Sequence, residues 1–158
     1  MSDVNAAPSR FPWPPVIYLL AIAIAIVLSI AVPLPWFGPP LSDLLFAIGW
    51  LLVVAAVALD FMAIRTLRKA QTTVMPTRAA DHLVTSGPFG LSRNPIYLGN
   101  TTLMFGIGLI TGFIWFFVLA LVAAFATQKL AIEPEERHLS IRFGKRYRDY
   151  SKKVRRWI

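Results

Sequence analysis

The sequence predicts an all-α integral membrane protein with about four transmembrane helices, a cytoplasmic loop and an amphipathic C-terminal helix. Hydrophobic residues make up 56% of the 158 residues and charged residues only 15%, which is too few to cover the surface of a soluble domain of this size. The apolar residues fall into long runs, and the basic residues are concentrated in two segments. We therefore expect a single membrane domain that covers residues 1–158.

Four apolar runs predict the membrane spans, and their lengths are close to what a bilayer requires. The runs cover approximately residues 16–36, 44–64, 97–111 and 113–130. Gly112 separates the last two runs, which predicts a tight helical hairpin. A cleaved signal peptide ending at 29–31 is the alternative for the first run. The length of that run and its single basic flanking residue, Arg10, favour a span.

The distribution of basic residues predicts the orientation in the membrane. Of the 16 lysines and arginines, one precedes the first run, five lie in residues 65–96 and ten lie in residues 129–158. The positive-inside rule then places both termini, the loop 65–96 and the tail 131–158 in the cytoplasm, and we expect an inner membrane of the bacterial type. The basic pairs of the tail, 152–153 and 155–156, are expected to contact anionic lipid rather than nucleic acid.

A turn-rich loop before the third run is the first segment that could carry chemistry. Pro95 disfavours a helix continuing through Asn94, but it fits the first turn of the helix that follows. The free N–H groups of that helix start would face Arg93 and the loop, an arrangement that favours an anionic ligand. The structural alternative is a capped helix start whose Arg93 contacts a lipid phosphate.

A stripe of residues after the fourth run is the second such segment. Spacings of three or four residues place Glu135, Leu139, Phe143, Tyr147, Tyr150, Val154 and Trp157 on one face of a helix. The alternative is a break at Gly144, which would shift the second half of the stripe. All residues of the stripe except Glu135 are apolar or aromatic, so Glu135 is expected on the packed side, where an unpaired carboxylate is costly. A cationic ligand would relieve that cost. The alternative is an ion pair between Glu135 and Arg93 that serves structure alone.

Other residues offer less. The chain has no cysteine and only two histidines, His82 and His138, so we expect neither a metal site nor a thiolate nucleophile. Asp60 lies near the end of the second run and is expected to pair with Arg65 or Arg68.

The two segments together resemble the isoprenylcysteine carboxyl methyltransferase family and its phospholipid methyltransferase relatives. Those membrane enzymes have a loop of the form L-V-x-x-G-P-[FY]-x-x-x-R-[HN]-P-x-Y-x-G, which residues 83–99 match. They also have a later E-E-x-x-L-x-x-x-F-G-x-x-Y-x-x-Y, which residues 135–150 match. The resemblance covers about residues 70–156.

The resemblance implies S-adenosylmethionine as methyl donor and a lipophilic acceptor that enters from the bilayer. The donor would bind in a cytoplasmic pocket enclosed by the loop, the ends of the last two spans and the C-terminal helix. Arg93 and Glu135 are the catalytic residues that it implies. The cofactor-binding residues implied by motif position are Asp81, His82, Leu83, Val84, Phe89, Asn94, Pro95, Ile96, Tyr97, Glu135 and Glu136.

Two departures from the family pattern concern the acceptor. Asn94 stands where the eukaryotic branch has a histidine, and asparagine cannot act as a general base. Ala131 stands where the prenylcysteine enzymes have a basic residue for the substrate carboxylate, which argues against a prenylcysteine substrate. The alternatives are a small four-helix transporter, a lipid-binding or partner-binding adaptor, and a membrane reductase. The sequence shows no nicotinamide fingerprint, and no acid lies in the first, third or fourth run.

Overall fold

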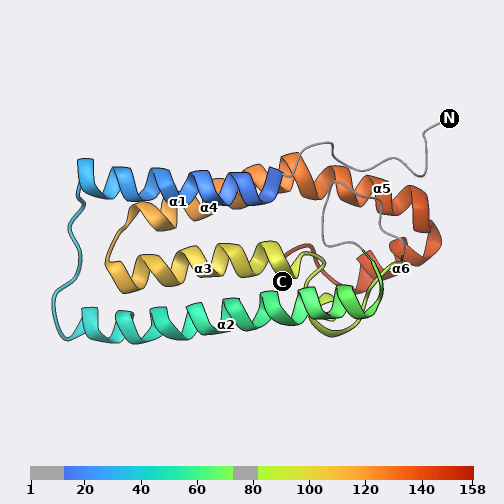
Figure 1. Ribbon diagram of the computed structural model, residues 1–158, viewed down its shortest axis with the longest axis horizontal. Coiled ribbons are helices and arrows are strands. Elements are labelled where there is room, and N and C mark those ends of the chain that lie inside the picture. The colour runs from blue at the N-terminus through green and yellow to red at the C-terminus, as the bar shows by residue number, and fades with distance from the viewer. Residues whose placement is uncertain (1–12, 73–81) are drawn as a thin grey trace.

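The computed structural model describes residues 13–72 and 82–158, and all regular elements in these two ranges are helices (Figure 1). The elements are α1 (Trp13–Ala31), α2 (Leu41–Lys69), the 3₁₀ helix η1 (Gly87–Gly90), α3 (Pro95–Thr111), α4 (Trp115–Thr127), the π-helical turn η2 (Gln128–Ile132), α5 (Glu133–Phe143) and α6 (Lys145–Lys153). Helices α1 to α4 form a bundle. The α1–α2 and α3–α4 connections lie at one end of it, and α5 and α6 lie at the other (Figure 1).

Three helices are long and apolar enough to cross a membrane. They are Trp13–Ala31, Leu41–Lys69 and Trp115–Phe143, the last a continuous helix formed by α4, η2 and α5. Helix α3 has 17 residues and packs against both α2 and α4. The predicted all-helical fold is therefore confirmed, with three helices that are long and apolar enough to span a membrane.

The helix boundaries differ from the predicted spans where proline, glycine or charge is involved. The first helix ends at Ala31 rather than near residue 36, because Pro33 and Pro35 cannot continue it. The second helix extends beyond the apolar run and includes Arg65, Arg68 and Lys69 in its last turns. Pro95 occupies the first turn of α3, as predicted. Gly112 ends that helix with a φ of 72°, a left-handed conformation that glycine adopts without strain.

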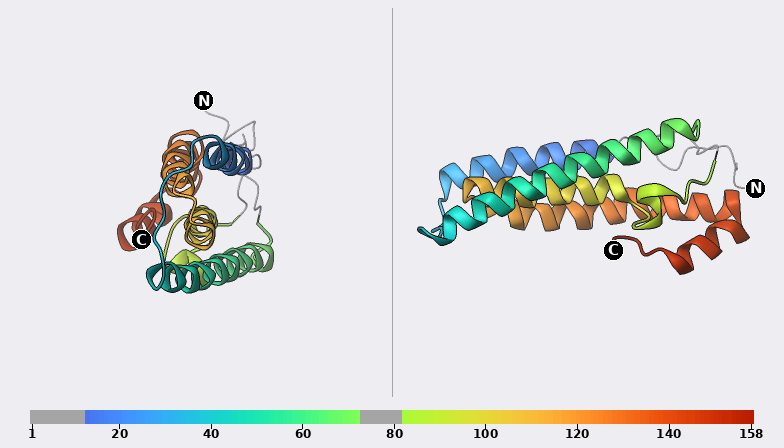
Figure 2. Two further views of the ribbon diagram at one scale, coloured as in Figure 1. Left: turned by 90° about the vertical axis from the view of Figure 1, so that its left-hand side faces the viewer. Right: turned by 90° about the horizontal axis from the view of Figure 1, so that it is seen from below.

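The predicted amphipathic C-terminal helix is divided into two helices at Gly144, the alternative that the sequence left open. Gly144 has φ 52° and ψ −120° and separates α5 from α6. After this break the chain turns back toward the bundle (Figure 2). The reversal buries Tyr147 and Tyr150, which belonged to the predicted stripe.

A π-helical turn joins α4 to α5. Pro134 has no N–H to donate to the carbonyl of Leu130, and its ring would crowd that carbonyl in a regular α-helix. The wider turn Gln128–Ile132 accommodates the proline without ending the helix. It changes the phase of the helix, so the outward face of α4 does not continue directly into α5.

Small residues bring the helices of the bundle into close contact. A Cβ atom added to Gly106 of α3 would lie 2.9 Å from the carbonyl oxygen of Gly49 in α2 and 2.8 Å from Cγ2 of Val53. Glycine is thus required for the observed separation of α2 and α3. On the other side of the bundle, α1 and α4 pack through fully or nearly fully buried alanines: Ala21, Ala25, Ala120 and Ala123.

Asp60 does not form the predicted ion pair with Arg65 or Arg68. Its side chain lies against α3, where a Cβ atom on Gly99 would overlap the carboxylate. The Oδ1 atom of Asp60 is buried and has no hydrogen-bond partner within residues 13–72 and 82–158. The prediction assumed that the Asp60 carboxylate points along α2 toward the arginines of its last turns. The carboxylate points instead across to α3.

The glycine contact between α2 and α3 leads to a stability prediction. We expect Gly106→Ala to destabilise the protein by about 1–3 kcal/mol, because the new methyl group meets backbone that cannot rotate away. Thermal unfolding of the purified protein in detergent measures the effect. Gly38→Ala is the matched control, since no atom lies within 4 Å of the added Cβ. Equal unfolding midpoints for the two variants would contradict the role of this contact.

Candidate active site

A cavity of about 300 Å³ lies at the end of the bundle where α5 and α6 are found. Its walls come from the first turn of α1, the end of α2, the loop that follows residue 81, the start of α3, and helices α5 and α6. The residues that line it are Pro14, Pro15, Leu67, Thr72, His82, Leu83, Val84, Phe89, Arg93, Asn94, Pro95, Ile96, Tyr97, Asn100, Glu135, Glu136, Leu139, Tyr147 and Tyr150.

The cavity brings the two predicted segments together. Every predicted site residue that the structure describes lines it: His82, Leu83, Val84, Phe89, Arg93, Asn94, Pro95, Ile96, Tyr97, Glu135 and Glu136. Asp81 lies outside the described residues. The catalytic and cofactor-binding roles assigned to these residues stay predictions.

Several lining residues were missed by the sequence analysis. Pro14 and Pro15 lie in the first turn of α1. Leu67 lies in the last turn of α2 and Thr72 just after it, and Asn100 is one turn into α3. The first four belong to segments outside both motifs, so nothing local marked them. Asn100 did offer a signal, because it is the one side-chain amide in the run 97–111 and lies one turn after Ile96.

The loop is held in place from two sides. Gly87 has a φ of 60°, and a Cβ there would lie 3.3 Å from the hydroxyl oxygen of Thr66, which shows how closely the loop approaches α2. On the opposite side, the hydroxyl of Tyr150 donates a 2.6 Å hydrogen bond to the carbonyl oxygen of Phe89. The loop therefore spans from the end of α2 to α6, and Phe89 is fixed at the cavity wall.

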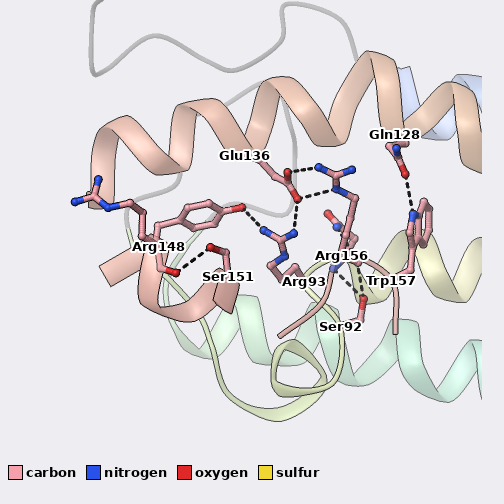
Figure 3. Close-up of polar contacts among 10 residues, drawn as sticks. Ser92, Arg93, Gln128, Glu136, Arg148, Ser151, Arg156 and Trp157 are labelled. Atoms are coloured by element: carbon pink, nitrogen blue, oxygen red, sulfur yellow. Dashed lines mark hydrogen bonds and ion pairs between the residues drawn. The ribbon is translucent and has the colours of Figure 1, made fainter. Parts of the chain in front are cut away.

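A charged network forms one side of the cavity, and Glu136 is at its centre (Figure 3). Arg156 donates from Nε to Oε1 of Glu136 at 3.0 Å and from Nη2 to Oε2 at 2.7 Å. Arg93 places Nη2 3.2 Å from Oε1 of the same carboxylate. The side chains of Arg93 and Glu136 are only 15% and 17% exposed, so water screens this ion pair weakly.

This network corrects two predictions. The alternative in which Arg93 pairs with Glu135 is wrong, because the partner of Arg93 is Glu136. Arg156 was expected to contact lipid with its neighbours, but its guanidinium group is committed to Glu136. That contact raises the pKa of Arg156 above its usual value, so the cation persists at any physiological pH.

Glu135 has a different environment from Glu136. The hydroxyl of Tyr97 faces its carboxylate, and the negative charge of Glu136 repels it. Among the described residues no lysine, arginine or histidine forms an ion pair with it. Glu133, two residues earlier in the same turn of α5, is by contrast paired with Lys129 at 2.7 Å. Glu135 is thus a carboxylate on the cavity wall that has no cationic partner in the part of the chain that the structure describes.

Two tyrosines of α6 complete the wall. Arg93 donates from Nη1 to the hydroxyl oxygen of Tyr147 at 3.1 Å. Burial, followed by the negative charge of Glu136, raises the pKa of Tyr147 to about 12. Burial likewise raises the pKa of Tyr150. Both hydroxyls are therefore neutral near pH 7 and act here as hydrogen-bonding groups rather than as bases.

Comparison with known proteins bears on this site. The family model described as phospholipid methyltransferase matches residues 44–146, which include the loop, α3, α4, α5 and both glutamates. Searches of curated proteins and of solved structures return no significant match. The matched range covers more than half of the chain and contains most of the cavity wall. The chain belongs to the phospholipid methyltransferase family.

Proposed function

We propose that this protein transfers a methyl group from S-adenosylmethionine to a lipophilic acceptor that resides in the membrane. The observation that carries the proposal is Glu135, a carboxylate on the wall of a cavity at the end of a membrane bundle, with no cationic partner in residues 13–72 and 82–158. An unpaired carboxylate in such a place is costly, and either a proton or a cationic ligand can neutralise it; a cationic ligand would hold it in its charged form. S-adenosylmethionine carries two cationic groups, an ammonium and a sulfonium.

Other parts of the cavity suit the remaining groups of this donor. The backbone N–H groups of Ile96 and Tyr97 belong to the first turn of α3, where they lack intrahelical partners and favour a carboxylate. The Phe89 and Tyr97 rings offer aromatic surface for adenine. The side-chain N–H₂ group of Asn94 donates a hydrogen bond to the carbonyl of Arg156. The side-chain oxygen of Asn94 is then available to accept a hydrogen bond from a ligand. When bound, S-adenosylmethionine would supply an electrophilic methyl group.

The chemistry asked of the protein is mainly positioning. Methyl transfer from a sulfonium needs the nucleophile, the methyl carbon and the sulfur in line, with water excluded. Under this proposal, Glu135 holds a cationic group of the donor, and Arg93 orients an anionic group of the donor or acceptor. The two terminal nitrogens of Arg93 already contact Glu136 and Tyr147. Its buried Nε has no hydrogen-bond partner among the described residues.

The acceptor would reach the cavity from the bilayer between α1 and α2. These helices lie on opposite sides of α3 (Figure 2), and the cavity wall includes Pro14 and Pro15 of α1 and Leu67 of α2. We infer that α3 is a fourth span and that both termini and the loop 65–96 are cytoplasmic, in keeping with the positive-inside rule. Ala131 is buried and uncharged, so we do not extend the proposal to a prenylcysteine carboxylate.

Removing the unpaired carboxylate tests donor binding. We expect Glu135→Ala to weaken binding of labelled S-adenosylmethionine to the purified protein by roughly tenfold or more, since it removes a charged partner of the ligand. Glu133→Ala is the matched control. It removes the same side chain from the same turn of α5, but Glu133 is paired with Lys129 and does not line the cavity. Equal affinities for the two variants, or no binding by the wild-type protein, would refute the proposal.

The acceptor class has a separate test. Membrane extracts incubated with the protein and trideuteromethyl-labelled donor are expected to yield a labelled product that partitions into the organic phase and is identified by mass spectrometry. The Glu135→Ala protein is expected to yield far less of it, because the donor no longer binds well. Label found only in water-soluble molecules or in protein would show that the acceptor is not lipophilic.

A further inference from the structure

The last residues of the chain return to the cavity and contact the turn that precedes α3. The backbone N–H of Arg93 donates to the carbonyl of Arg155 at 3.0 Å. The side chains of Ser92 and Asn94 both donate to the carbonyl of Arg156, at 3.2 and 2.9 Å. Each residue of the turn 92–94 is thus bonded to the C-terminal segment, although more than 60 positions separate them in the sequence.

The Arg156 side chain adds a second link to the same turn. Its bidentate contact with Glu136 leaves the carboxylate held between two guanidinium groups, those of Arg156 and Arg93. The planar guanidinium matches both carboxylate oxygens, a geometry that fixes the rotamer of Glu136 as well as its charge. Because Glu136 and Tyr147 are the two described residues whose side chains bind the Arg93 side chain, the position of Glu136 in turn helps to determine the position of Arg93.

We propose that Arg156 is a positioning residue of the active site. It acts through Glu136 to hold Arg93 at the cavity wall, and it neutralises Glu136 so that Glu135 is the carboxylate available to a cationic ligand. This inference rests on the proposed function. It assigns a role in that function to a residue outside both sequence motifs and outside residues 44–146, the range that the family model matches.

The physical reason lies in the charge balance of the cavity wall. Without Arg156, two adjacent carboxylates would share one guanidinium, that of Arg93. Arg93 would then be drawn toward both carboxylates, and Glu136 would be free to rotate toward a cationic ligand in competition with Glu135. Either change moves the groups that would contact the donor, although Arg156 itself does not line the cavity.

The test compares Arg156→Ala with Arg155→Ala in the full-length protein. Both variants keep the backbone carbonyls that bond residues 92–94, and the Arg155 side chain is exposed. We expect Arg156→Ala to weaken binding of S-adenosylmethionine by about tenfold, the effect of losing a charge-assisted contact, and Arg155→Ala to leave the affinity unchanged. Arg156→Lys keeps the charge but loses the bidentate geometry, so it is expected to restore part of the affinity.

A double-mutant comparison separates positioning from a general loss of stability. If Arg156 acts through Glu136, Arg156→Ala should weaken donor binding much less in a Glu136→Gln background than in the wild type. An Arg156→Ala affinity equal to that of the wild type, or equal losses in the Arg155 and Arg156 variants, would overturn the inference. If Arg156→Ala does not fold, Arg156→Lys decides: an affinity equal to that of the wild type would also overturn it. Absence of binding by the wild-type protein would instead count against the proposed function.

Discussion

The rest of the site depends on how differently two consecutive glutamates are surrounded: Glu136 is paired with arginines and Glu135 is not. Successive residues of an α-helix point about 100° apart, so Glu135 and Glu136 face different neighbours from the same turn of α5. Glu136 accepts contacts from two guanidinium groups. Glu135 faces a neutral tyrosine and the charge of Glu136. A carboxylate pair in a shielded place is stable only if at least one member is neutralised, and the arginines neutralise Glu136.

That arrangement requires α5 to extend past the end of the bundle and the chain that follows α5 to pack back against it. The π turn lets the helix continue through Pro134, and the backbone at Gly144 then reverses the chain so that α6 and the tail close over α5. The loop supports the cavity from the side of α2, where Gly87 approaches Thr66. Further into the bundle, Gly49 and Gly106 set the spacing between α2 and α3, and α3 carries Pro95 to Tyr97 into the wall.

How much of this could be predicted from the sequence depends on how local each feature is. Apolar runs, the proline at the start of α3 and the break at Gly112 are local, and the sequence predicts them well. The gathering of the two motifs at one cavity followed from the resemblance to a family rather than from spacing alone. The contact of Arg156 with Glu136, the approach of Asp60 to Gly99 and the reversal at Gly144 depend on tertiary packing. Gly144 gave a local signal for the break in the stripe, but not for the direction that the chain takes after it.

The location of the cavity also explains how a chain without cysteine or a metal-binding motif could perform methyl transfer. A charged donor is soluble in water and a lipophilic acceptor is soluble in the bilayer, so a site that meets both must lie at the boundary. The cavity has charged walls from α5 and the loop, and apolar walls from Leu67, Pro14 and Pro15 at the ends of two membrane helices. With the sulfonium donor that we propose, the methyl group would already be activated, so alignment of the two molecules would be the main requirement. A bundle whose helix ends are fixed by glycine contacts and by the C-terminal segment is suited to that task.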